Sequence, residues 1–274
     1  MKPHARLLLL MAFLASLFTP LSAAPTINTP AGIDPKPWDA LLKKHVNDEG
    51  LVAYEKWKSD AADMKALDAF LEGYSPEPKQ PAKGAEEIAA LINAYNAFTI
   101  RWILQNYPTE SIRALDDSFG GARWKISGRT VSLDEIEHKN LRPLIGWKVH
   151  ATIVCAARSC PPLQREAFIA EKLDAQINAA YRAWLGREDL NRFDPAANRV
   201  VVSPIFKWFK DDFTGDGELP KMLARHAPER NRAFLEKGEF KIEYLDYNWG
   251  LNDQSGRGSK FRAGLLDRLF GNAK

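Results

Sequence analysis

The segment that most constrains the fold is an apolar stretch over residues 86–107. Its sequence, EEIAALINAYNAFTIRWILQNY, has the strongest helical pattern in the chain, and Pro108 follows it directly. Proline lacks the N–H that would continue a helix, so the spacing predicts a helix that ends near this point. Helical periodicity also recurs over residues 38–45, 64–71, 132–141 and 171–185.

Shorter runs rich in β-branched and aromatic residues predict strands between these helices. We expect strands at residues 147–155, 199–206 and 240–249, and a hairpin over residues 123–133 that turns at Ser127 and Gly128. The elements interleave without a regular βαβ repeat or a glycine-rich phosphate loop. The sequence therefore predicts an α+β fold, as a single compact domain in which a small, mostly antiparallel sheet packs with helices.

The first 23 residues have the layout of a cleavable secretory signal. The basic residues Lys2 and Arg6 precede an apolar run over residues 7–18, and the small residues Ser22 and Ala23 follow. The run is too short for a membrane-spanning helix, so no stable membrane insertion is expected after cleavage. We expect a proline-rich linker over residues 24–37 and a domain over residues 38–274, in a protein exported to the periplasm or secreted.

Composition and charge narrow the classes of partner. Hydrophobic residues make up 45% of the chain and charged residues 27%, as in a folded soluble protein. Loss of the leader lowers the formal net charge from +3 to +1. A near-neutral protein has no electrostatic basis for binding nucleic acid, so we expect a small-molecule or peptide ligand. No motif indicates a cofactor.

Asn93 and Asn96 are unusual polar residues in the most apolar helix. They lie three residues apart and thus on one face, and an amide in such a place needs hydrogen-bond partners. Two interpretations are open. The amides could anchor the main chain of a nearby loop, which we favour, or they could contact a substrate.

The segment VSLDEIEHKNLR places a carboxylate on an apolar stripe. Ser132 and Glu135 form a capping box for the helix, and Glu137 lies on the stripe of its apolar residues. A buried carboxylate must be paired or protonated, so we expect Glu137 to be buried near a basic group. That group could be Arg142 in a structural ion pair, or His138 in a catalytic pair.

Two further segments carry candidate residues. His150 lies on the expected strand before the cysteines, on the same face as Thr152 and Val154. The segment DDFTGDGEL resembles the start of a calcium loop, but Leu223 stands where an EF-hand has glutamate. We therefore expect a polar turn there.

The two cysteines lie five positions apart, in VHATIVCAARSCPPL. Pro161 and Pro162 follow Cys160 and fit the start of a helix, where a missing N–H costs nothing. Cys160 would then lie at the positive end of a helical turn, which favours the thiolate. Export adds a contrary expectation, because oxidising compartments favour a disulfide between Cys155 and Cys160.

Five ordered blocks carry a resemblance to a known family. LINAYNAFTIRWIL, VSLDEIEHKNLR, VHATIVCAARSCPPL, SPIFKWFKDDF and IEYLDYNWGLN resemble the blocks of the family catalogued as domain of unknown function 547 (DUF547), over residues 86–252. The family includes exported bacterial proteins. One position departs from its pattern, because Asn248 stands where aspartate is usual. The positions that match the family pattern are Asn93, Asn96, Glu137, His138, Arg142, His150, Cys155, Ser159, Cys160 and Pro161.

These residues leave three functions open. In the first, Cys160 is the nucleophile of a hydrolase or acyltransferase that acts on an amide, ester or thioester. His138 is the preferred base, Glu137 orients it, and His150 is held in reserve, in an arrangement of the papain or transglutaminase kind. The amides of Asn93 or Asn96 would polarise the acyl oxygen.

The other two functions use the cysteines differently. The second is a non-catalytic binding domain with a Cys155–Cys160 disulfide, which closes a short loop and adds about 2 kcal/mol. The third is a zinc site made by His138, His150 and the two cysteines, ranked last because the close ligand pairs typical of zinc sites are missing.

Overall fold

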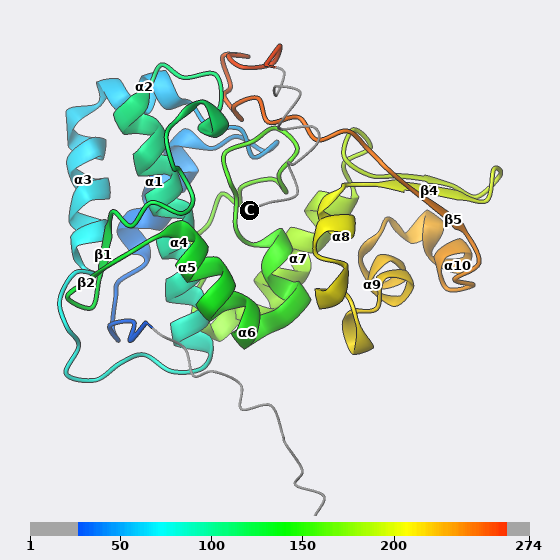
Figure 1. Cartoon of the computed structure of the whole chain (residues 1–274), viewed down its shortest axis with the longest axis horizontal. Helices are drawn as coiled ribbons and strands as arrows, with labels where there is room; N and C mark the ends of the chain where they lie inside the picture. The colour runs from blue at the N-terminus through cyan, green and yellow to red at the C-terminus, as the bar shows by residue number, and fades with distance from the viewer. Residues whose placement is uncertain (1–26, 262–274) are drawn as a thin grey trace, which may run out of the picture.

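The computed structural model describes residues 27–261, and the expected signal peptide lies outside this range. Within it the chain is an α+β protein with two small sheets (Figure 1). No helix between residues 27 and 261 has the length and apolarity needed to cross a membrane. The predicted α+β class is thus confirmed, although the structure has two small sheets where one was expected.

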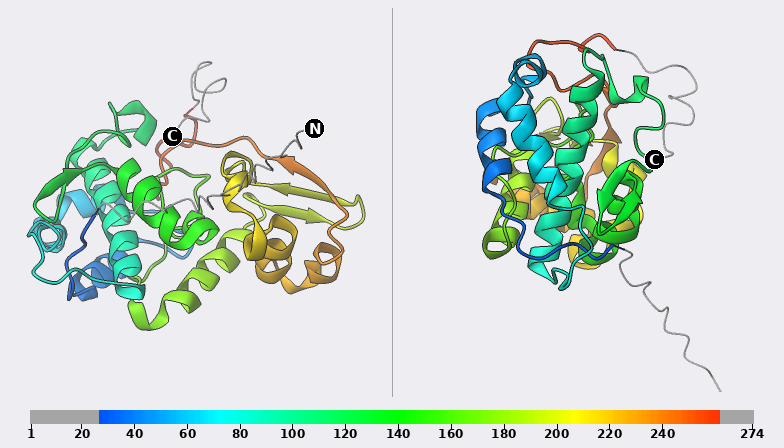
Figure 2. Two further views of the ribbon diagram at one scale, coloured as in Figure 1. Left: turned by 60° about the horizontal axis from the view of Figure 1, so that its bottom comes forward. Right: turned by 90° about the vertical axis from the view of Figure 1, so that its left-hand side faces the viewer.

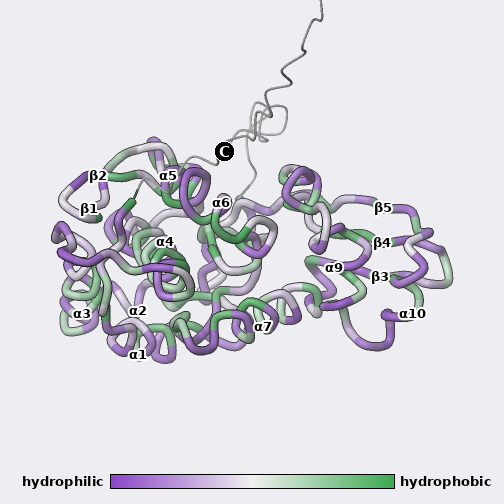
Figure 3. Tube along the Cα trace, turned by 90° about the horizontal axis from the view of Figure 1, so that it is seen from below, coloured by the Kyte–Doolittle hydropathy of each residue, from purple (hydrophilic) through white to green (hydrophobic). Residues whose placement is uncertain are grey.

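The first half of the chain forms a helical group around α4 (Ala85–Asn106). The other members are α1 (Lys36–His45), α2 (Tyr54–Ser59) and α3 (Ala61–Glu72). In α4 the buried positions run around the whole helix, as expected of an apolar helix inside a core. Figure 3 shows α4 as a largely hydrophobic segment within this group.

The segment expected to be a linker packs on this helical group instead. Ile27 is 1% exposed, and its N–H donates to Asn140 Oδ1 at 3.0 Å. Pro30 forms an isolated bridge with Pro81. Residues 27–35 therefore belong to the folded unit, because Ile27 supplies an apolar side chain to the core despite the prolines around it.

The predicted hairpin is confirmed, and the helix after it runs on beyond its predicted end. Strands β1 (Trp124–Ile126) and β2 (Arg129–Val131) pair antiparallel, with positive φ at Ser127 and Gly128. The chain continues as α5 (Leu133–Ile136), the π-helical turn η2 (Glu137–Leu141) and α6 (Arg142–Ile145). Pro143 comes two residues after the predicted end of this helix at residue 141. It lies in the first turn of α6, where its missing N–H is tolerated.

The strand expected over residues 147–155 is absent. Residues Gly146–Ala151 form the 3-10 helix η3, and the chain is irregular from Thr152 through the cysteines. A short apolar run does not by itself distinguish a strand from other buried chain. Here a side chain of α4, described below, takes the hydrogen bonds that a neighbouring strand would have supplied.

The second half contains a three-stranded sheet with helices beside it. Its order is β3 (Arg192–Asp194), β4 (Arg199–Val202), β5 (Lys241–Tyr244), with β3 antiparallel and β5 parallel to β4. Helix α7 (Leu173–Leu185) lies between the helical group and this sheet (Figures 2 and 3). The remaining helices here are α8 (Ile205–Trp208), α9 (Leu219–His226) and α10 (Arg232–Leu235), with short 3-10 turns at Ala170–Lys172, Lys210–Asp212, Gly215–Gly217 and Glu229–Asn231. In the first half, another 3-10 turn, Ile112–Ala114, follows α4.

After β5 the chain returns to the helical half and pairs with the cysteine loop. Leu251 bridges Ala157 in antiparallel fashion, and the Arg158 N–H donates to Gly250 O at 2.8 Å. On the other side, the Val52 N–H donates to Asn252 O at 2.8 Å. This return places the end of the described chain directly against the loop that carries both cysteines.

Candidate functional site

Two asparagines of α4 hold the chain on either side of the cysteines. Asn96 Nδ2 donates to Thr152 O at 2.9 Å, and the Val154 N–H donates to Asn96 Oδ1 at 2.8 Å. Asn93 makes the same two-sided contact with the main chain of Phe168, at 2.8 and 2.9 Å. Both side chains are 3% exposed. The favoured interpretation, that these amides anchor loops, is what the structure shows, and a role in substrate contact stays a prediction.

The cysteine loop brings both thiols to one hydroxyl group. Cys155 and Cys160 are both buried thiols. Tyr247 Oη lies 3.1 Å from Cys160 Sγ and 3.4 Å from Cys155 Sγ, while the Cys155 N–H donates to Cys160 Sγ at 3.2 Å. The Cys160 sulfur thus accepts one main-chain N–H and lies within hydrogen-bond distance of a phenol.

The helix expected after Cys160 is absent. Residues 161–164 have no regular structure, so no helical turn points its N-terminus at the thiol. The loop is instead fixed by pairing with the returning chain. The Ser159 N–H donates to Asn248 O at 3.2 Å, and the Asn248 N–H donates to Ser159 Oγ at 2.9 Å. The polar groups next to the Cys160 thiol are therefore the Cys155 N–H and the Tyr247 hydroxyl, and not the N-terminus of a helix as predicted.

His150 belongs to a second polar cluster, built on Asp212. His150 Nε2 lies 2.7 Å from Asp212 Oδ2, and the imidazole stacks on Phe209 at 4.3 Å between ring centres. Arg142 binds the same carboxylate through Nε and Nη2, at 2.8 and 2.9 Å. The structural ion pair of Arg142 is therefore with Asp212, which the sequence offered only as part of a polar turn.

Glu137 and His138 lie beside this cluster. Glu137 is 1% exposed, which confirms that it is buried, and Tyr95 donates to its Oε2 at 3.3 Å. Its Oε1 lies 3.9 Å from His138 Nδ1, which is too long for a hydrogen bond. Arg142 Nη1 is closer to that nitrogen, at 3.3 Å. The orientation of His138 thus depends on Arg142 more than on Glu137.

Burial and hydrogen bonds together set the protonation states in both clusters. It lowers the pKa of His150 below the ordinary histidine value, against the opposing hydrogen bond to Asp212. For Asp212, burial favours the neutral acid, but the hydrogen bonds from His150 and Arg142 outweigh it and hold the pKa well below its usual range. Burial raises the pKa of Tyr247 well above its usual range, and the negative charge of the two cysteines adds to the rise. Tyr247 is therefore a protonated hydroxyl at neutral pH.

The zinc interpretation finds no support in the geometry. Over residues 27–261, no three His, Cys, Asp or Glu side chains lie close enough together to hold a metal ion. The four proposed ligands are divided between two clusters. Both cysteines contact Tyr247, whereas His150 contacts Asp212 and His138 contacts Arg142.

Comparisons with known proteins place part of the chain in a family. The searches of curated proteins and of solved structures each found no match. Residues 80–185 match the family model described as "Protein of unknown function, DUF547". The match contains α4 with its two asparagines, the Glu137–His138 pair, His150 and both cysteines. Residues 80–185 are therefore a domain of the DUF547 family.

Proposed function

We propose that this protein is a cysteine-dependent hydrolase or acyltransferase in which Cys160 attacks an amide, ester or thioester carbonyl. The observation that carries the proposal is the surroundings of the Cys160 sulfur, with the Cys155 N–H at 3.2 Å and the Tyr247 hydroxyl at 3.1 Å. Both groups are donors to a thiolate, and hydrogen bonds to a charged form favour that form. A thiolate is the nucleophilic state of cysteine.

The proposal places the general base at His150 rather than His138. A guanidinium only donates, so His138 Nδ1 must accept from Arg142, and its lone pair is already used. The Asp212 carboxylate only accepts, so His150 Nε2 carries the proton and Nδ1 keeps a free lone pair. Since burial keeps His150 neutral, this lone pair is available to accept a proton at neutral pH.

The proposed steps follow the chemistry of acyl transfer. His150 Nδ1 takes the thiol proton of Cys160 through water, because the two side chains lie in separate clusters, and the thiolate adds to the carbonyl carbon. The bond to the leaving group breaks as that group receives the proton from His150, which leaves a thioester on Cys160. Water or another nucleophile then attacks the thioester, and the thiol is restored. Asp212 stabilises the imidazolium formed on the way.

The test is labelling with an electrophilic acyl probe, such as an acyl phosphate or an activated ester. We compare the wild type with Cys160→Ala and with Cys155→Ala, which removes the other thiol on the same phenol. We expect labelling to disappear with Cys160→Ala alone, and to fall more with His150→Gln than with His138→Gln. Equal labelling of both cysteine variants would contradict the proposal. A quantitative Cys155–Cys160 disulfide in the native protein would support a binding domain instead.

Export is the second part of the proposal. The leader over residues 1–23, followed by a near-neutral domain, supports a periplasmic or secreted protein with a small-molecule or peptide ligand. N-terminal sequencing of the mature protein tests this, with Ala24 expected as the first residue. A mature protein that begins at Met1 and stays with the cytoplasm would refute it.

A further inference from the structure

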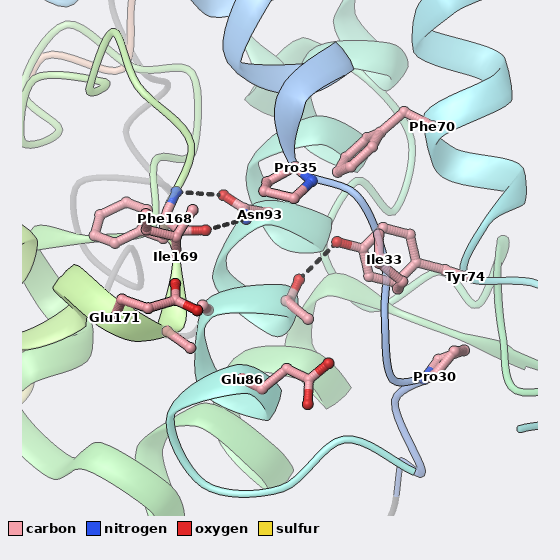
Figure 4. Close-up of a pocket in the computed structure, with 13 residues that line it drawn as sticks. Pro30, Ile33, Pro35, Phe70, Tyr74, Glu86, Asn93, Phe168, Ile169 and Glu171 are labelled. Atoms are coloured by element: carbon pink, nitrogen blue, oxygen red, sulfur yellow. Dashed lines mark hydrogen bonds between the residues drawn. The ribbon is translucent and has the colours of Figure 1, made fainter. Parts of the chain in front are cut away.

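A hollow on the helical half lies apart from the cysteine loop. It has a volume of about 270 Å³, and its walls come from the residues before α1, the end of α3, the first turns of α4 and the chain before α7 (Figure 4). Pockets for drug-sized ligands hold roughly 300–1,000 Å³, so this one suits a smaller molecule. One wall of the hollow is formed by residues 30–35, which belong to the segment expected to be a linker and pack on the domain instead.

The walls of the hollow combine apolar and polar surface, and the polar groups of Tyr74 and Asn93 are already engaged. Ile33, Pro35, Phe70 and the Tyr74 ring supply apolar surface. The Tyr74 hydroxyl donates to Ala90 O at 2.9 Å. The Asn93 amide, which also lines the hollow, has both ends on the main chain of Phe168. These groups shape the hollow and have little capacity left to select a polar ligand.

Two carboxylates face the same space. Glu86 and Glu171 both line the hollow, at the end away from Phe70 (Figure 4). Glu86 Oε1 accepts the Gly32 N–H at 2.7 Å, which holds that carboxylate in place. No Lys, Arg or His is among the described residues that line the hollow. An apolar space with two carboxylates and no cation is complementary to a positive charge carried on an apolar stem.

We infer that this hollow binds an alkylammonium group, with the stem against Ile33 and Phe70 and the ammonium between Glu86 and Glu171. A free amine and a lysine side chain share this chemistry. An ammonium has three N–H donors, which suits carboxylates that can only accept. The inference does not depend on acyl transfer at Cys160, because Glu86 and Glu171 take no part in the steps proposed there.

The experiment follows binding by amide chemical shifts in the intact protein. The probe is n-butylammonium chloride, and 1-butanol is the neutral control with the same stem. We expect shifts at Ile33 and Ala90 with the amine, weaker shifts with the alcohol, and weaker amine binding at higher salt. A parallel titration with Nα-acetyl-lysine amide distinguishes a lysine side chain from a free amine as the natural ligand. Binding tighter than that of butylammonium would assign the site to a lysine side chain in a peptide. Weaker binding would assign the site to a free amine.

Variants test the two halves of the inference separately. Replacing both carboxylates, Glu86→Gln with Glu171→Gln, should weaken amine binding by about 2- to 20-fold while leaving butanol binding unchanged. The glutamine side chain introduced by Glu86→Gln retains an oxygen for the Gly32 N–H, so the fold should persist. The matched control is Glu166→Gln, an exposed glutamate outside the hollow, which should bind the amine like the wild type. Equal binding of amine and alcohol, or full amine binding by the double variant, would overturn the inference.

Discussion

Asn96→Ala is the substitution that best tests how the cysteine loop is held. The asparagine is 3% exposed and bonds two buried main-chain groups, the carbonyl of Thr152 and the N–H of Val154. Alanine leaves a donor and an acceptor buried without partners. Each unsatisfied buried group costs about 1–3 kcal/mol, so the free energy of unfolding should fall by about 2–6 kcal/mol. That is a large part of the roughly 5–15 kcal/mol that stabilises a typical domain.

The assay is equilibrium unfolding in urea, followed by tryptophan fluorescence. Asn106→Ala is the matched control, because Asn106 lies at the end of the same helix, is half-buried and bonds the carbonyl of Trp102 at 2.8 Å. Water can replace that contact, so its loss should cost less than about 1 kcal/mol.

Hydrogen exchange provides a second, local measurement. The amide of Val154 should be protected in the wild type and exchange much faster in Asn96→Ala, since its acceptor is gone. If Asn96→Ala were no more destabilising than Asn106→Ala, or if the Val154 amide kept its protection, then the α4 amide would not be what holds this chain in place.

Three further predictions concern the thiols, a close contact and pH. Tyr247→Phe removes a hydrogen-bond donor to Cys160. A hydrogen bond to a charged group is stronger than one to a neutral group by about 1 kcal/mol, so the thiolate should be about fivefold less populated and thiol labelling near pH 7 about fivefold slower. An unchanged labelling rate would refute the role of the phenol. Gly50→Ala should lower the free energy of unfolding in urea by about 1–3 kcal/mol more than Gly32→Ala. Both glycines have a φ of +75°, so the backbone strain is matched. At Gly50 alone of the two, the added Cβ would meet main chain, 2.5 Å from Leu163 N. Burial lowers the pKa of His45, His150 and His226 below about 6.5, the pKa of histidine in an unfolded chain. Below that pH the unfolded chain binds protons that the folded chain does not, so the free energy of unfolding should fall. Equal urea midpoints at pH 7.5 and pH 5.5 would contradict this prediction.

The elements that were predicted correctly are determined by residues that lie close together in the sequence. The helix at residues 86–107 follows from its local periodicity, and the β1–β2 turn follows from the conformational freedom of Gly128 beside Ser127. The strand expected at residues 147–155 failed for the opposite reason. Its first residues form a 3-10 helix, and two later main-chain groups, Thr152 O and the Val154 N–H, bond Asn96. Asn96 is 58 residues from Val154 in sequence, and no local pattern contains that contact.

The candidate site also has a part that the sequence could predict and a part that it could not. Its residue types were identifiable, because buried carboxylates, histidines and cysteines are rare enough to stand out. Their partners were not identifiable, since Asp212 is 62 residues from His150 and Tyr247 is 87 residues from Cys160. Both partners lie beyond the matched residues 80–185, in two segments whose sequences, SPIFKWFKDDF and IEYLDYNWGLN, resemble DUF547 blocks. For Tyr247 that resemblance was the one sequence signal, whereas Asp212 also lay in the segment expected to be a polar turn.

The asparagine that departs from the family pattern is explained by what its side chain does here. Asn248 Oδ1 accepts the N–H of Gly250 at 2.9 Å, and this bond shapes the turn just after Tyr247. An aspartate oxygen can accept the same N–H, so either residue serves the turn. The main chain of Asn248 then pairs with Ser159 on both sides, which fixes the phenol of Tyr247 over the two thiols. What the structure shows at this position is therefore an acceptor oxygen for the turn, which asparagine and aspartate can both supply.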